Sequence, residues 1–255
     1  MPDRTTVLTS AALLGAAAVA WVSVVRSSLH GDDMMMTMPM PATWADGTVF
    51  VLGWAVMMAA MMLPSALPMI ALYGAIRGSK VAPGRRAVGH GVPVAIFTAV
   101  YLAVWAVSGA PVYLAHTALM AVPGSGLAYG VAIVLMAAGA FQLSPLKQAC
   151  LRACRSPLGF LLGHWRPGGW GSLALGWYHA IYCLGCCWAL MLVLVAAGAM
   201  GLRWVLLITA VVAAEKLLPG GEWIARATGV ALVVLGMTVA VRPELVMVLR
   251  GAHAM

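Results

Sequence analysis

The segment HAIYCLGCCWALM, residues 179–191, holds a histidine, three cysteines and a methionine within an apolar run that extends over residues 172–200. A run of this length can cross the hydrocarbon core of a membrane as a helix, which takes roughly 20 residues. Polar and ionisable groups are costly inside a membrane, so a concentration of metal-binding side chains there indicates a functional site. The segment therefore predicts both a membrane-spanning helix and a functional site built from metal-binding side chains.

The rest of the chain is similarly apolar. Of its 255 residues, 63% are hydrophobic and 9% are charged, which exceeds what the core of a soluble domain requires. We therefore expect an all-α, polytopic transmembrane helix bundle, with residues 1–255 forming a single integral-membrane domain. Seven crossings are predicted, with six as the alternative because the sixth run is short. The runs lie at residues 7–25, 48–74, 91–114, 127–144, 172–200, 201–218 and 223–241.

The net charge of +8 comes from basic residues in the connections between apolar runs, with no basic stripe of the kind that binds nucleic acid. If the N-terminus is cytoplasmic, the three most basic connections share the cytoplasmic side, as the positive-inside rule requires. We therefore expect a multi-pass protein of a bacterial inner membrane, with the lipid bilayer as its partner and no nucleic acid. The three groups are Arg77, Lys80, Arg85 and Arg86; Lys147, Arg152, Arg155 and Arg166; and Lys216 and Arg226.

The spacing of the ligand-type residues in the fifth run predicts a metal site. His179, Cys183, Cys187 and Met191 follow one another at intervals of four, which places them on one ridge of a helix, with Cys186 beside them. Thiolate, thioether and imidazole together favour Cu(I), with Zn(II) second. The alternative is packing, because free cysteine and methionine also fill hydrophobic cores.

The second run offers complementary ligands. Met57, Met58, Met61 and Met62 lie at offsets 0, 1, 4 and 5, on two adjacent ridges of a helix. Two prolines follow and free backbone carbonyls that need partners, so we expect this segment to face the bundle interior. A mixed sulfur and imidazole cage between the second and fifth runs is therefore predicted.

A third set of thiols lies in the connection after the fourth run. Residues 145–157 are expected to form a short amphipathic helix bounded by two prolines, near the membrane surface with its basic residues outward. Cys150 and Cys154 are four residues apart in it, a spacing that suits a metal ion or two reduced thiols. The arginines beside them are expected to lower the thiol pKa values.

Two further segments carry candidate functional groups. Residues 26–47 hold five methionines in seven positions with His30 and two aspartates, which is typical of a loop that collects soft metals. A periplasmic metal donor is a candidate partner for it. In the sixth run, Glu215 is expected to point into the bundle as a proton carrier or structural partner, whereas Lys216 reaches toward the interface.

Four motifs, AMMLPSALPM, LSPLKQACLRACRSP, YCLGCCWALM and EKLLP, make residues 50–220 resemble an uncharacterised bacterial family of predicted metal-binding integral membrane proteins. In that family a histidine is frequent between Leu151 and Cys154, where this chain has Ala153. The resemblance implies functional roles for Met57, Met61, Met62, Pro64, Ser65, Lys147, Cys150, Cys154, Arg155, His179, Cys183, Gly185, Cys186, Cys187, Trp188, Met191, Glu215 and Lys216.

The sequence favours a membrane protein that binds Cu(I) between the second and fifth spans, for metal uptake, transfer or homeostasis. The Met-rich loop would collect the ion and the Cys150/Cys154 pair would serve as an exit or sensor. Two alternatives stay open: a membrane redox enzyme or metallocentre that uses the cysteines, and a scaffold or assembly subunit without metal. No Ser/His/Asp order, nucleotide-binding glycine pattern or zincin sequence is present, so a hydrolase is not expected.

Overall fold

The computed structural model describes residues 4–30, 44–79, 88–123, 125–166, 168–196 and 202–250, and these segments contain helices and no strand. The predicted all-α class is confirmed. The helices are α1 (Arg4–His30), α3 (Trp44–Ser79), α4 (Val88–Val107), α5 (Gly109–Met120), α6 (Ser125–Leu143), α7 (Pro145–Arg155), α8 (Pro157–His164), α9 (Gly168–Ala196), α10 (Leu202–Leu217), α11 (Gly221–Val241) and α12 (Leu245–Leu249).

Within the described segments, six helical stretches are long and apolar enough to cross a membrane. They lie in α1, α3, α4 together with α5, α6, α9 and α11. The sixth apolar run forms α10, which has 16 residues. At 1.5 Å per residue it is about 24 Å long, shorter than a typical hydrocarbon core. Six stretches therefore have spanning length, and the predicted seventh crossing, α10, is shorter than that.

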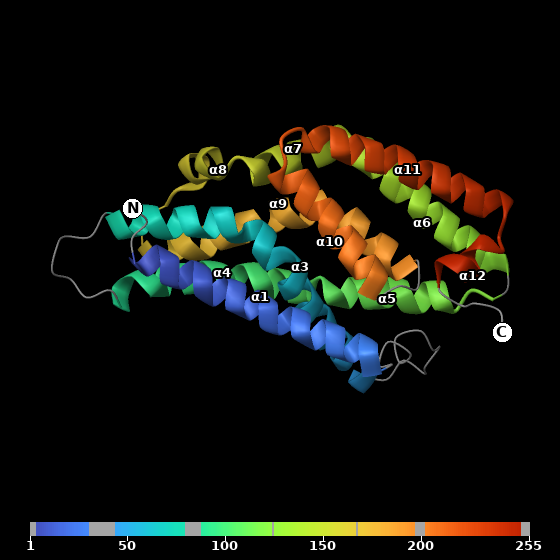
Figure 1. The fold of residues 1–255 in the computed structure, drawn as a ribbon, viewed down its shortest axis with the longest axis horizontal. Helices are drawn as coiled ribbons and strands as arrows, with labels where there is room; N and C mark the ends of the chain where they lie inside the picture. The colour runs from blue at the N-terminus through green and yellow to red at the C-terminus, as the bar shows by residue number, and fades with distance from the viewer. Residues whose placement is uncertain are drawn as a thin grey trace.

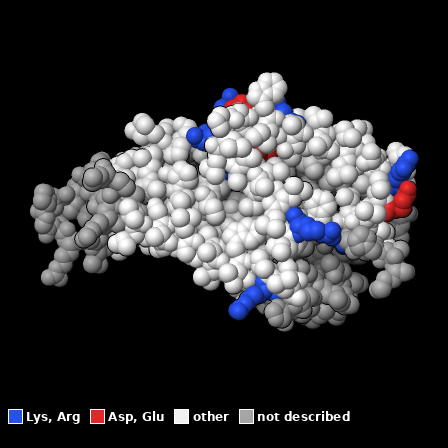
Figure 2. Space-filling view, in the orientation of Figure 1, with Lys and Arg blue, Asp and Glu red and all other residues white. Residues whose placement is uncertain are grey.

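The long helices run roughly along the long axis of the molecule and pack in pairs, with α1 on α3, α4 on α9, and α6 on α11 (Figure 1). The shorter α10 packs against α11 and also contacts α3, α7 and α9. The face in Figure 2 is largely uncharged, with only a few separate charged side chains. Such a surface is compatible with lipid on the outside of the bundle.

Glycines allow α6 and α11 to approach closely. A Cβ added at Gly139 would lie 2.6 Å from the Gly229 carbonyl oxygen, and one added at Gly229 would lie 2.9 Å from the Gly139 carbonyl oxygen. Helices in membranes gain little from the hydrophobic effect, so close backbone contact between small residues is a main source of their association. Close backbone contact therefore holds α6 and α11 together as one structural unit.

Helix α3 continues through both of its prolines and bends along its length (Figure 1). Proline removes a backbone donor and crowds the preceding turn, which is a common cause of such bends. The Ser65 hydroxyl donates to the Met62 carbonyl oxygen at 3.0 Å. Met57, Met58, Met61 and Met62 are all buried, so the expectation that this segment faces the bundle interior is confirmed.

Helix α7 has the predicted bounds but not the predicted orientation. Pro145 occupies its first turn, and the Ser144 side chain caps it by accepting from the Lys147 backbone N–H at 3.2 Å. Lys147 itself is fully buried, so the prediction that the basic residues of this helix point outward is wrong for Lys147. The Arg152 side chain is 65% exposed, as expected. One face of α7 therefore belongs to the interior of the bundle.

Candidate metal centre

Four thiols from two helices meet inside the bundle. Helix α9 buries Cys183, Cys186 and Cys187, each 1% exposed, and α7 contributes Cys154. The Cys186 sulfur lies 3.3 Å from the Cys187 sulfur and 3.8 Å from the Cys154 sulfur. The Cys186 thiol also donates to the Cys183 backbone carbonyl oxygen at 3.1 Å, one turn earlier on α9. We call Cys154, Cys183, Cys186 and Cys187 the thiol cluster.

The side chain of Lys216 enters this cluster from α10. Its ammonium nitrogen lies 3.1 Å from the Cys183 sulfur, 3.9 Å from the Met62 sulfur and 3.3 Å from the Ser65 hydroxyl oxygen. The prediction that Lys216 reaches toward the interface is therefore wrong, and the residue is only 8% exposed. Adjacent residues on a helix point in different directions, so Lys216 faces α3 and α9 while its neighbour Glu215 faces α7.

That neighbour, Glu215, forms a buried ion pair. Its carboxylate lies 2.7 Å from the Lys147 ammonium and accepts from the Gln142 side-chain amide at 2.7 Å. Arg155 donates to the Glu215 backbone carbonyl at 2.6 Å, and Lys147 also donates to the carbonyl of Cys186. The expectation that Glu215 points into the bundle is confirmed. Through this network, α6, α7 and α10 are fixed to the part of α9 that carries the thiols.

His179 lies one helical turn before Cys183 and is 4% exposed. Its ring stacks near Phe97 and Tyr101, with ring centroids 5.7 and 5.4 Å apart. Neither ring nitrogen has a hydrogen-bond partner among the described residues, although buried polar atoms usually have one. The Tyr101 hydroxyl lies 3.1 Å from the Cys183 sulfur, so these rings adjoin the thiol cluster.

The predicted methionine ligands are all in the core. Met57, Met58, Met61, Met62 and Met191 are each at most 4% exposed. Met62 reaches the thiol cluster through its contact with the Lys216 ammonium. For the other four, burial agrees equally with packing and with ligation, so their metal-binding role stays a prediction.

The two cysteines of α7 have different surroundings. Cys154 joins the thiol cluster, whereas the Cys150 sulfur faces Gly185 of α9, where an added Cβ would lie only 2.9 Å away. Burial raises the pKa of Cys150, and interaction with the neighbouring Cys183 thiol raises the pKa of Cys154. The prediction that the neighbouring arginines lower these pKa values is wrong, because Arg155 binds the Glu215 carbonyl and Arg152 points outward.

Sequence patterns did not indicate the contacts of Tyr101 and Lys216 with Cys183. Tyr101 lies in an apolar run outside the four motifs, and the EKLLP motif marks Lys216 without indicating which side chain it contacts. The Met-rich segment falls mostly on residues 31–43, which lie outside the described residues. Within the described parts, no group of three or more His, Cys, Asp or Glu side chains is arranged as a ready metal site.

The fold and the site together define an all-α bundle with apolar helices long enough to cross a membrane and a buried cluster of thiols. Residues 51–239 match the PpoB2 family, which is described as a copper chaperone family, and the chain belongs to it. No curated protein matches the chain, and neither does any solved structure.

Proposed function

We propose that this protein is an integral membrane copper chaperone that binds Cu(I) at the thiol cluster and transfers it. The observation that carries the proposal is the convergence of sulfur from three helices. The Lys216 ammonium contacts both Cys183 of α9 and Met62 of α3, while Cys154 of α7 approaches Cys186. Membership of a copper chaperone family supports copper as the ion.

The donor set fits Cu(I) better than a hard cation. Thiols and a thioether surround the site, and the nearby carboxylate of Glu215 is already paired with Lys147 and Gln142. Soft sulfur ligands select Cu(I), whereas hard cations require oxygen ligands. The free ring nitrogens of His179 offer a further donor one turn from Cys183.

The positive charge of Lys216 also favours a monovalent ion over a divalent one at this site. The ammonium occupies a position next to the Cys183 sulfur that a bound cation would take. A Cu(I) ion that binds beside Cys183 would displace the Lys216 ammonium, either because the side chain moves away or because it loses its proton, and each ligand thiol would release its proton to bind as a thiolate. A divalent ion would add a buried charge, which is costly in an apolar interior.

The route of the ion follows from the order of ligands. We propose that residues 26–47 collect copper from a periplasmic donor and that the methionines of α3 pass it to the thiol cluster. Cys154 is half-buried and is the proposed exit. The site would then bind copper but also release it, as transfer requires. Consistent with this route, we place the single domain in a bacterial inner membrane with a cytoplasmic N-terminus.

Metal analysis of the purified protein tests the proposal. Protein prepared under reducing, copper-replete conditions is expected to hold stoichiometric copper, and the variant Cys183→Ser/Cys187→Ser is expected to lose it. Cys150→Ser is the matched control, since Cys150 is a buried thiol of α7 outside the cluster. Unchanged copper in the double variant, or no copper in the parent protein, would reject the site.

A further inference from the structure

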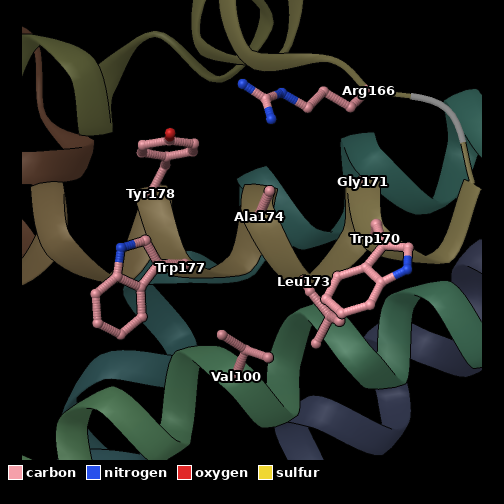
Figure 3. Close-up of a pocket in the computed structure, with 8 residues that line it drawn as sticks. All are labelled: Val100, Arg166, Trp170, Gly171, Leu173, Ala174, Trp177 and Tyr178. Atoms are coloured by element: carbon pink, nitrogen blue, oxygen red, sulfur yellow. The ribbon is translucent and has the colours of Figure 1, made fainter.

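A second feature of the molecule lies away from the thiol cluster, along the first turns of α9. An open pocket of about 690 Å³ is formed there by α9, Val100 of α4 and the segment that precedes α9. Figure 3 shows its lining residues, none of which belongs to the thiol cluster. The pocket therefore requires its own explanation, independent of copper.

The lining of this pocket is divided into a polar and an apolar part. Arg166 extends its guanidinium toward the side on which the Tyr178 hydroxyl lies, whereas Trp170, Leu173, Trp177 and Val100 lie on the other side (Figure 3). Trp170 is 84% exposed. A ligand that fills the pocket must therefore combine a polar group with an apolar body.

Arg166 indicates the charge of that polar group. Arg166 is exposed, and neither of the ion pairs between described residues includes it. Guanidinium groups bind phosphate through paired N–H donors, and the Tyr178 hydroxyl can add another donor. An arginine outside the described ion pairs, in a pocket that a phenol also lines, favours a phosphate group that carries a net negative charge.

The position of the pocket at the start of the α9 span indicates where the apolar body of the ligand lies. The apolar stretch of α9 begins at Trp170, four residues after Arg166. Tryptophan and tyrosine gather at the level where a membrane meets water, and basic pockets between spanning helices bind anionic headgroups. The pocket thus extends from the polar edge of a predicted span onto its apolar surface.

We propose that this pocket binds an anionic phospholipid, with its phosphate on Arg166 and Tyr178 and an acyl chain along Trp177, Leu173 and Val100. The charge of the pocket distinguishes this occupant from a zwitterionic lipid, whose own cation competes with Arg166. The same charge distinguishes the anionic phospholipid from a quinone, which carries no negative charge that the guanidinium could bind.

Lipid binding to the purified, delipidated protein can be measured by native mass spectrometry during titration with phosphatidylglycerol or phosphatidylcholine. We expect phosphatidylglycerol to bind roughly fivefold more tightly. Arg166→Gln should remove this preference, whereas Trp177→Ala should weaken both lipids. Arg203→Gln is the matched control, since it removes the same charge from another exposed position and should keep the preference.

Three results would overturn the assignment. The first is a phosphatidylglycerol preference that survives in Arg166→Gln. The second is displacement of the lipid by inorganic phosphate alone, which would make the pocket a site for free anions. The third is a quinone that copurifies with the parent protein and is lost in Trp177→Ala. Since Arg166 is exposed and contributes no described contact to the core, Arg166→Gln is expected to fold normally.

Discussion

The ammonium of Lys216 lies 3.1 Å from the sulfur of Cys183 inside the bundle, where it also contacts the Met62 thioether and the Ser65 hydroxyl. A buried charge is tolerated only with partners that stabilise it. Here the partners are the same sulfur atoms that the proposed function assigns to Cu(I). The lysine therefore competes with the metal for Cys183.

Replacing Lys216 by methionine should strengthen copper binding. Lys216→Met removes the competing cation and adds a thioether, so we expect about tenfold tighter Cu(I) binding. Competition with a Cu(I)-specific chelator measures the affinity. Lys216→Arg keeps the charge and serves as the control, with no gain expected. Weaker binding by Lys216→Met would contradict competition and indicate that the ammonium supports the ligand sulfur.

Removing the charge of Glu215 should destabilise the protein. Glu215→Gln leaves the fully buried Lys147 ammonium without its carboxylate partner, and breaking a buried pair in this way costs about 3–5 kcal/mol. Thermal unfolding in detergent should therefore occur at a clearly lower temperature. The double variant Lys147→Met/Glu215→Leu removes both charges and should recover much of the loss. A single variant as stable as the parent would show that the pair contributes little.

A side chain at Gly139 should separate α6 from α11. The Cβ of Gly139→Ala would meet the Gly229 carbonyl oxygen at 2.6 Å and the Val233 nitrogen at 2.8 Å, and such overpacking costs about 1–3 kcal/mol. The unfolding temperature is the measurement. Gly15→Ala is the control, because an added Cβ there has no neighbour within 4 Å. Equal effects of the two substitutions would refute the close contact.

The packing of Gly185 against Cys150 should control copper affinity indirectly. Gly185→Ala would push α7, and with it Cys154, away from α9, because the added Cβ meets the Cys150 sulfur at 2.9 Å. We expect about tenfold weaker Cu(I) binding, a magnitude typical of residues that support metal ligands. The double variant Gly185→Ala/Cys150→Ala makes room and should restore the affinity. Failure of this rescue would mean that Gly185 acts in another way.

Residue types and their spacing were enough to predict the fold class and the burial of the sulfur side chains. Long apolar runs can satisfy their backbone hydrogen bonds in a membrane only as helices, so the all-α class follows from composition alone. The intervals of four that separate His179, Cys183 and Cys187 fix their placement along one side of α9, because the α-helix has a constant period. Burial of Met57 to Met62 was predictable in the same way.

Only the tertiary structure decided what these helix faces meet. Cys150 and Cys154 have the spacing of a pair, yet Cys154 contacts Cys186 while Cys150 packs on Gly185. Lys147 and Lys216 have the sequence context of surface lysines, yet both are buried with partners from other helices. Local spacing determines which side chains share a face of one helix. The neighbour of that face depends on how distant segments pack, and helix periodicity contains no information about it.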